Sequence, residues 1–273
     1  MSVVDYVLDE FREMKNLDPE TVHEDFGAVD FALFYPFSIR WSPFLISGIL
    51  SAISIVVPAA FFGEHGVSAI PYDWRTVFII PGILLMGFMY RVGENSAKER
   101  MLPRYGDWLN LAVSGLHFTI FMLIFFGMAW TLSLPNFYIH GFAGQGLAFG
   151  LNVLFTYVWF PLAGYYFYTG SITRAYTYGW KRAFRTAVTK KYLKRTLYFV
   201  ALVIPEVLII YVISLIPAPF GGPAAAFYSA YLFLFLVAYA GYIQYDSLKE
   251  RGKLGEVVNG DNGDISAAKN IEQ

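Results

Sequence analysis

Residues 109–134 read LNLAVSGLHFTIFMLIFFGMAWTLSL, and this stretch decides the class of the protein because it carries no charged side chain. The uncharged run extends from Trp108 to Thr173, which is 66 residues, and a second run from Val207 to Tyr245 covers 39 residues. A helix that crosses a bilayer needs about 20 apolar residues. Each run is therefore long enough for two membrane-spanning helices, and the pattern excludes a cytosolic enzyme.

The composition of the whole chain agrees with a membrane protein. Of its 273 residues, 56% are hydrophobic, 19% are aromatic and only 15% are charged, and the mean hydropathy is +0.47. A soluble domain carries about 25% charged residues. The chain has no cysteine, which excludes disulfides, thiolate metal centres and covalently attached haem. The net charge of −1 gives no global field that would attract nucleic acid.

Apolar runs bounded by charged residues predict an all-α, polytopic bundle of six membrane-spanning helices. The expected spans are residues 42–62, 73–91, 109–134, 146–168, 196–216 and 224–245. The second span is the shortest, because only 15 uncharged residues, Thr76 to Tyr90, separate Arg75 from Arg91. Both arginines must then extend toward the headgroups.

The distribution of Lys and Arg predicts how the spans are oriented. These residues gather between the second and third spans and between the fourth and fifth, whereas the three alternate loops together hold only Arg75. Because basic loops stay on the cytoplasmic side, we expect a multi-pass protein of the cell membrane with both termini in the cytoplasm. Residues 1–40 then form a cytoplasmic N-terminal segment, 41–246 the membrane domain, and 247–273 a disordered cytoplasmic tail.

Two cytoplasmic segments have amphipathic patterns. Residues Val3 to Leu17 place apolar side chains at helical spacing opposite acidic ones, which favours a helix that docks on the bundle or one that covers the basic segment. That basic segment, Gly170 to Arg195, interleaves aromatic residues with eight positive charges. The spacing predicts an interfacial helix whose cations face anionic lipid headgroups at about 1 kcal/mol each. The candidate headgroup-binding residues are Lys181, Arg182, Arg185, Lys190, Lys191, Lys194 and Arg195. Single-stranded nucleic acid would also suit basic and aromatic residues, but no RNA- or DNA-binding motif accompanies them.

Glu206 is the only acid or base of the Asp, Glu, Lys and Arg types near the middle of a predicted span, and Pro205 precedes it. An acid at this depth together with a proline kink is typical of a cation or proton site in transporters. The alternative is a neutral, structural Glu206 that hydrogen-bonds to a neighbouring helix. The possible partners are Asn152, Tyr157, Tyr165, Ser51 and Ser54.

No pattern in the chain indicates catalysis. The four histidines, His23, His65, His117 and His140, are too dispersed to predict a haem or metal site. Nucleophile, phosphate-loop and dinucleotide motifs are absent from the sequence. We therefore expect no enzymatic activity, no cofactor and no metal.

Several short motifs resemble those of a known family. They are Tyr35-Pro36 with Trp41; Gly87, Tyr90, Arg91 and Val92; Pro103, Tyr105, Asp107 and Trp108; Gly115-Leu116; and Thr169-Gly170. Over about residues 31–246 the chain resembles an archaeal family of multi-pass membrane proteins catalogued only as a domain of unknown function. The resemblance implies a topology and an archaeal origin but no activity. The residues themselves favour a structural role, in which Asp107 caps the third span and Trp108 anchors it at the membrane interface.

These observations lead to two functional hypotheses. The leading one is a non-enzymatic scaffold or accessory subunit that packs with itself, with a protein partner or with anionic lipid. The competing one is a small-solute or ion transporter or channel that uses Glu206.

Overall fold

The computed structural model describes residues 28–62, 72–98, 108–139, 141–217 and 220–250, and within them almost every residue is helical. In chain order the elements are α2 (Ala28–Phe34), η1 (Tyr35–Phe37), α3 (Ser38–Phe62), α4 (Tyr72–Lys98), α5 (Trp108–Leu132), α6 (Pro135–Tyr138), α7 (Phe142–Thr169), α8 (Ile172–Arg174), the π-helical turn η3 (Ala175–Gly179), α9 (Trp180–Ala187), α10 (Lys190–Ser214) and α11 (Gly221–Glu250).

Each of the six apolar segments predicted from the sequence coincides, to within a few residues at most ends, with one long helix. These helices, α3, α4, α5, α7, α10 and α11, contain 25 to 30 residues. Three stretches within the described residues are long and apolar enough to cross a membrane, namely Trp108–Tyr138, Phe142–Thr169 and Gly221–Lys249. The all-helical prediction is therefore confirmed for the described residues, and a membrane location is supported by three helices.

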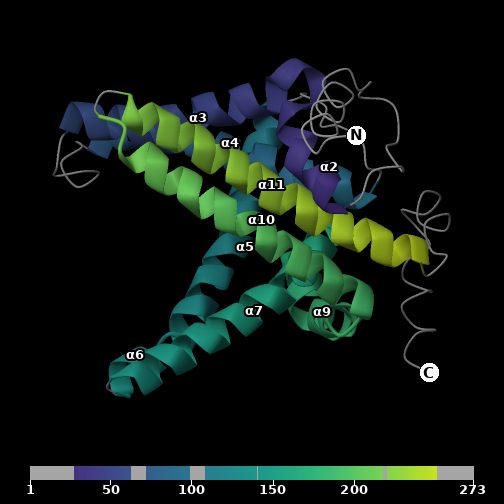
Figure 1. Cartoon of the computed structure of the whole chain (residues 1–273). Coiled ribbons are helices and arrows are strands. Elements are labelled where there is room, and N and C mark those ends of the chain that lie inside the picture. The colour runs from purple at the N-terminus through teal and green to yellow at the C-terminus, as the bar shows by residue number, and fades with distance from the viewer. Residues whose placement is uncertain (1–27, 63–71, 99–107, 140, 218–219, 251–273) are drawn as a thin grey trace, which may run out of the picture.

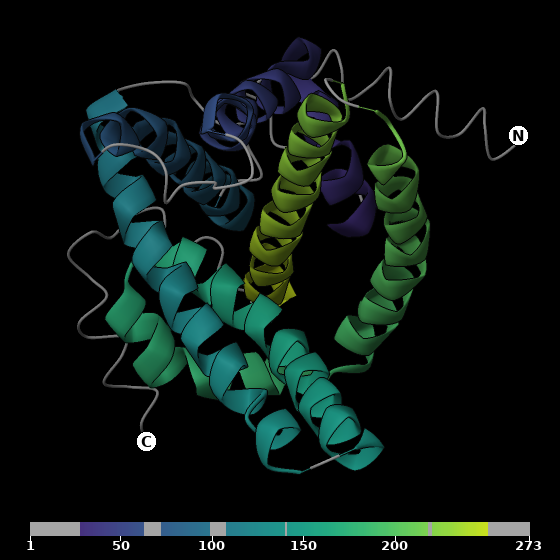
Figure 2. The ribbon, with the colours of Figure 1, turned by 90° about the vertical axis from the view of Figure 1, so that its left-hand side faces the viewer.

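Helix α11 lies at the centre of the fold. It packs against α3, α4 and α7, and α10 lies along another of its sides (Figures 1 and 2). Glycines permit the close crossings. A Cβ atom added to Gly164 of α7 would lie 2.3 Å from the carbonyl oxygen of Ala240, and one on Gly241 would lie 2.5 Å from that of Gly93. Only a residue without a side chain fits at such positions.

Helices α5 and α7 form an arm that extends away from the other long helices, with α6 at its tip (Figure 1). At the base of the arm, α5 crosses α4 through Gly115, where a Cβ atom would lie 2.0 Å from the carbonyl oxygen of Ile83. Farther along the arm, a Cβ atom added to Gly146 or to Gly150 would meet no other atom within 4 Å. The spacing of these two glycines is typical of helix contacts, but no other described residue of the chain packs against them.

Candidate functional site

The basic segment begins where α7 ends. Gly170 has a φ of +64°, and its N–H donates to the carbonyl of Tyr166 at 2.8 Å. A left-handed residue at this position ends a helix and is usually glycine. Ser171 then opens α8, because its Oγ accepts the N–H of Arg174 at 3.3 Å. The chain thereby reverses, and α9 lies against α7.

Small residues attach this segment to α7. The buried positions recur every fourth residue and are Ala175, Gly179, Ala183 and Ala187. A Cβ atom on Gly179 would lie 2.8 Å from Cδ1 of Leu162 and 2.9 Å from Cδ1 of Tyr165, so the contact is close. Part of the apolar side of the segment therefore packs against α7, while Phe184 and Val188 are 54% and 82% exposed.

The segment is not one helix, which differs from the continuous helix predicted over Gly170 to Arg195. Helix α9 ends at Ala187, and α10 begins at Lys190 because Thr189 caps it by accepting the N–H of Tyr192 at 3.3 Å. We call the turn at Val188 and Thr189 the elbow. The cations after the elbow belong to the first turns of the same helix that contains the predicted fifth span.

The seven predicted headgroup-binding residues have three different environments. Five are exposed, namely Lys181, Arg185, Lys190, Lys191 and Lys194, and Lys191 also lies near a carboxylate. The guanidinium carbon of Arg182 lies 4.9 Å from the centroid of the Tyr165 ring, within the range of a cation–π contact. Lys191 and Arg195 lie beside a carboxylate.

That carboxylate is Asp246 on α11, which sequence reasoning missed. Asp246 is only 7% exposed; its Oδ2 accepts a hydrogen bond from Nη2 of Arg195 and lies 3.9 Å from Nζ of Lys191. The contact joins the start of α10 to the end of α11. The available signal was an acid that directly follows the uncharged run ending at Tyr245.

Two tyrosines also join the elbow to α7. Pro161 has no N–H, so the carbonyl of Tyr157, four residues earlier, lacks its helical donor. The hydroxyl of Tyr192 donates to this carbonyl at 2.6 Å, and the hydroxyl of Tyr157 donates to the carbonyl of Ala187 at the end of α9. Burial raises the pKa of the Tyr192 phenol above its usual 10.0, so this hydroxyl stays protonated and remains a donor.

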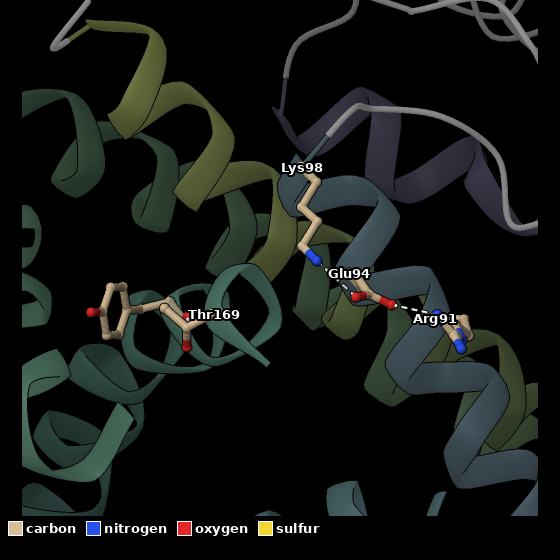
Figure 3. Close-up of polar contacts among 5 residues, drawn as sticks. Arg91, Glu94, Lys98 and Thr169 are labelled. Carbon is tan, nitrogen blue, oxygen red and sulfur yellow. Dashed lines mark hydrogen bonds and ion pairs between the residues drawn. The ribbon is translucent and has the colours of Figure 1, made fainter. Parts of the chain in front are cut away.

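A second charged group lies on α4. Glu94 accepts from Nη1 of Arg91 and from Nζ of Lys98, each at 2.9 Å (Figure 3). Figure 3 also places Thr169 on α7, where its hydroxyl donates to the carbonyl of Tyr165 at 2.9 Å. Glu94 thus bonds to both cations, and α4 continues to Lys98, beyond the predicted end of the second span at Arg91.

Residues of the family-like motifs meet near these groups. The rings of Tyr90 on α4 and Tyr166 on α7 are 5.6 Å apart, and a Cβ atom on Gly170 would lie 3.2 Å from the Tyr90 hydroxyl. The Tyr166 hydroxyl is 3.0 Å from Nδ1 of His117 on α5. The motif residues Tyr90 and Gly170 therefore lie together where α4 meets α7 at the start of the basic segment, and Tyr166 and His117, which are outside the motifs, join α7 to α5.

The remaining predicted residues lie elsewhere. Glu206 follows the exposed Pro205 in α10, but its side chain lies outside the described residues. Three of its suggested partners bond to other groups. Asn152 donates to Ser133 at 3.0 Å, Ser54 donates to the carbonyl of Leu50 at 2.7 Å, and Tyr157 donates to the carbonyl of Ala187. No group of three metal-ligating side chains occurs in the described part of the chain.

Trp108 opens α5 and is 64% exposed, as an interface anchor would be. Several other predictions concern residues outside the described ranges. They are the roles of Pro103, Tyr105 and Asp107, the amphipathic helix over Val3 to Leu17, and the disordered tail.

Comparison with known proteins gives one finding. Neither the curated proteins nor the solved structures yield a significant match. A family model described as "Protein of unknown function (DUF4013)" matches residues 75–221, from the second predicted span to the start of α11, including the whole basic segment. Because the match covers more than half of the chain, the protein belongs to this family of unknown function.

Proposed function

We propose that the protein is a multi-pass protein of the cell membrane in which six helices cross the bilayer, and that it acts without enzymatic activity as a scaffold or accessory subunit. In this proposal both termini and the basic segment lie in the cytoplasm, and the basic segment holds anionic lipid headgroups. A protein partner or a second copy of the chain would then bind to a surface of this protein that is held at the membrane.

The observation that carries the proposal is the way α9 is held. Its small residues fix it on α7, and its exposed cations, Lys181 and Arg185, therefore occupy defined positions. Phe184 and Val188 stay exposed beside them. Cations interleaved with exposed apolar side chains are typical of a surface that lies in the headgroup region.

The test compares the full-length protein with the variant K181Q/R185Q/K190Q/K194Q, each reconstituted in nanodiscs that mix phosphatidylglycerol with phosphatidylcholine. We expect the wild type to enrich the anionic lipid around itself and the variant to lose most of that enrichment, because each cation contributes about 1 kcal/mol. The variant K181R/R185K/K190R/K194R keeps all four charges and should keep the enrichment. Equal enrichment by all three proteins would contradict the lipid-binding role.

Transport of a small solute or ion through Glu206 is the second candidate function. It is favoured by an apolar pocket of about 390 Å³ that residues of η1, α3, α10 and α11 line. On α10 the lining residues are Ile209 and Ile213, one and two turns after the acid. The test measures proton and cation flux in proteoliposomes. Transport predicts that E206Q abolishes the flux and that E206D retains part of it, whereas an absence of flux in the wild type would remove this candidate.

A further inference from the structure

The basic segment has an outward face, opposite the small residues that hold it against α7. Helical residues three or four positions apart lie on one face, and exposed side chains of the segment follow this spacing. Within the described residues, the cations that precede the elbow make no ion pair. We call this face, together with the exposed Lys190 and Lys194 of α10, the basic surface. Before α10 it consists of Arg174, Tyr178, Lys181, Phe184, Arg185 and Val188.

The opposite charge lies in the first 27 residues of the chain. They contain eight acids and two cations, and thus a net charge of −6, whereas Gly170 to Arg195 contains eight cations and no acid. We propose that this acidic N-terminal segment, residues 1–27, docks on the basic surface and competes there with anionic lipid. The inference rests on the proposed function, because it needs the N-terminus and the basic segment on the same side of the membrane, and it names what regulates lipid access to the basic surface.

The N-terminal segment is long enough to reach the basic surface. It joins the described structure at Ala28, where α2 begins, and α2 packs against α10 and α11 (Figure 1). Helix α10 starts directly after the elbow, and its 25 residues extend over about 38 Å. Twenty-seven residues extend over up to about 90 Å. The segment can therefore reach the elbow and α9 from any point along α10.

The order of features along the N-terminal segment matches the order along the basic surface. Backwards from Ala28, a group of acids comes first, and it can meet the exposed Lys190 and Lys194 at the start of α10. Residues Val3 to Leu17 follow, with apolar side chains at helical spacing. They can cover the apolar side chains of the basic surface and remove them from water. The acids of the first group are Asp18, Glu20, Glu24 and Asp25.

Charge also determines what the N-terminal segment competes with. Anionic headgroups attract cations by about 1 kcal/mol each, and the same exposed cations attract the acids of residues 1–27. Because the segment is itself negative, anionic lipid repels it. The segment and the headgroups therefore exclude one another from the basic surface, and a membrane poor in anionic lipid favours the docked segment.

The test measures a distance in the full-length protein in a mild detergent without anionic lipid. Because the chain has no cysteine, N16C and T177C place one spin label on the N-terminal segment and one beside the basic surface. Double electron–electron resonance should give one narrow distance distribution. The variant D18N/E20Q/E24Q/D25N should lose most of the narrow component, whereas D18E/E20D/E24D/D25E keeps all four charges and should retain it.

The partner surface is tested in the same way. K181Q/R185Q/K190Q/K194Q should also lose the narrow component, and the combination of both neutral sets should cause no further loss, because each set already removes the same contact. A broad distribution in the wild type, or the same narrow distribution in all variants, would overturn the proposal. Loss of the narrow component on dilution with unlabelled protein would contradict docking within one chain and assign the contact to a second copy.

Lipid distinguishes the failure of this proposal from the failure of the proposed function. In nanodiscs, phosphatidylglycerol should broaden the distance distribution, and phosphatidylcholine alone should leave it narrow. A narrow distribution without any enrichment of anionic lipid would refute only the lipid-binding role. Enrichment of anionic lipid by a protein whose distribution is broad under all conditions would refute only the docking of residues 1–27.

Discussion

Gly115 and Gly146 are both glycines in apolar helices, but their surroundings are opposite. A Cβ atom on Gly115 would lie 2.0 Å from a backbone oxygen of α4, and one on Gly146 would meet nothing within 4 Å. The sequence shows a glycine in an apolar run at both positions, and it does not show which of the two glycines lies at a helix crossing. This depends on how the helices are placed in three dimensions.

We expect G115A to destabilise the protein by about 1–3 kcal/mol, because α4 and α5 must separate to admit the methyl group. G146A serves as the control and should leave the stability unchanged or slightly raised, since alanine has the higher helix propensity. Thermal unfolding followed by size-exclusion chromatography in detergent measures both. A stable G115A protein would contradict the described crossing.

The Tyr192 hydroxyl replaces the donor that Pro161 removes from α7. Y192F should therefore lower the stability by about 1–3 kcal/mol, because the partly buried carbonyl of Tyr157 then loses this donor. In a P161A background an N–H is restored inside α7, and the same substitution should cost clearly less. Y198F changes an exposed tyrosine of the same helix and should have little effect. If Y192F lowers the stability equally in the wild type and in P161A, the Tyr192 hydroxyl does not compensate for the N–H that Pro161 lacks.

Among the elements, the long helices could be predicted and their connections could not. Hydropathy is a local property, so six runs of apolar residues indicate six helices directly. The contacts Arg195–Asp246 and Tyr192–Tyr157 join residues 51 and 35 positions apart, and no local pattern relates them. The elbow did leave a signal, because Thr189 is a preferred residue at a helix start. The charges that follow it outweighed that signal and favoured one continuous helix.

The contact of Arg195 with Asp246 should fasten α10 to α11. We expect R195L to lower the stability by about 2–3 kcal/mol, since it leaves a largely buried carboxylate without its strongest partner. The double variant R195L/D246L removes both charges and should recover much of the loss. Hydrogen exchange of the first turns of α10 should rise in R195L and fall again in the double variant. A double variant less stable than R195L would contradict this account.

At the scale of the whole molecule, the central claim is that six helices cross the membrane, so that the basic segment and both termini lie on the same side of it. Composition and charge predict this topology, whereas length and apolarity support three helices directly. The difference arises in α3, α4 and α10. In each of these three helices, some residues lie outside the part of the chain whose side chains the structure describes.

The measurement that tests this claim most directly is single-cysteine labelling, for which the chain is suited because it has no cysteine of its own. Six spans predict that S68C and N136C react with a membrane-impermeant maleimide on intact cells. They also predict that S2C, T177C and N262C react only after the membrane is permeabilised. Three spans would place residues 2 and 68 on one side and residues 177 and 262 on opposite sides. Labelling of T177C from outside, or of N262C but not T177C, would contradict the account.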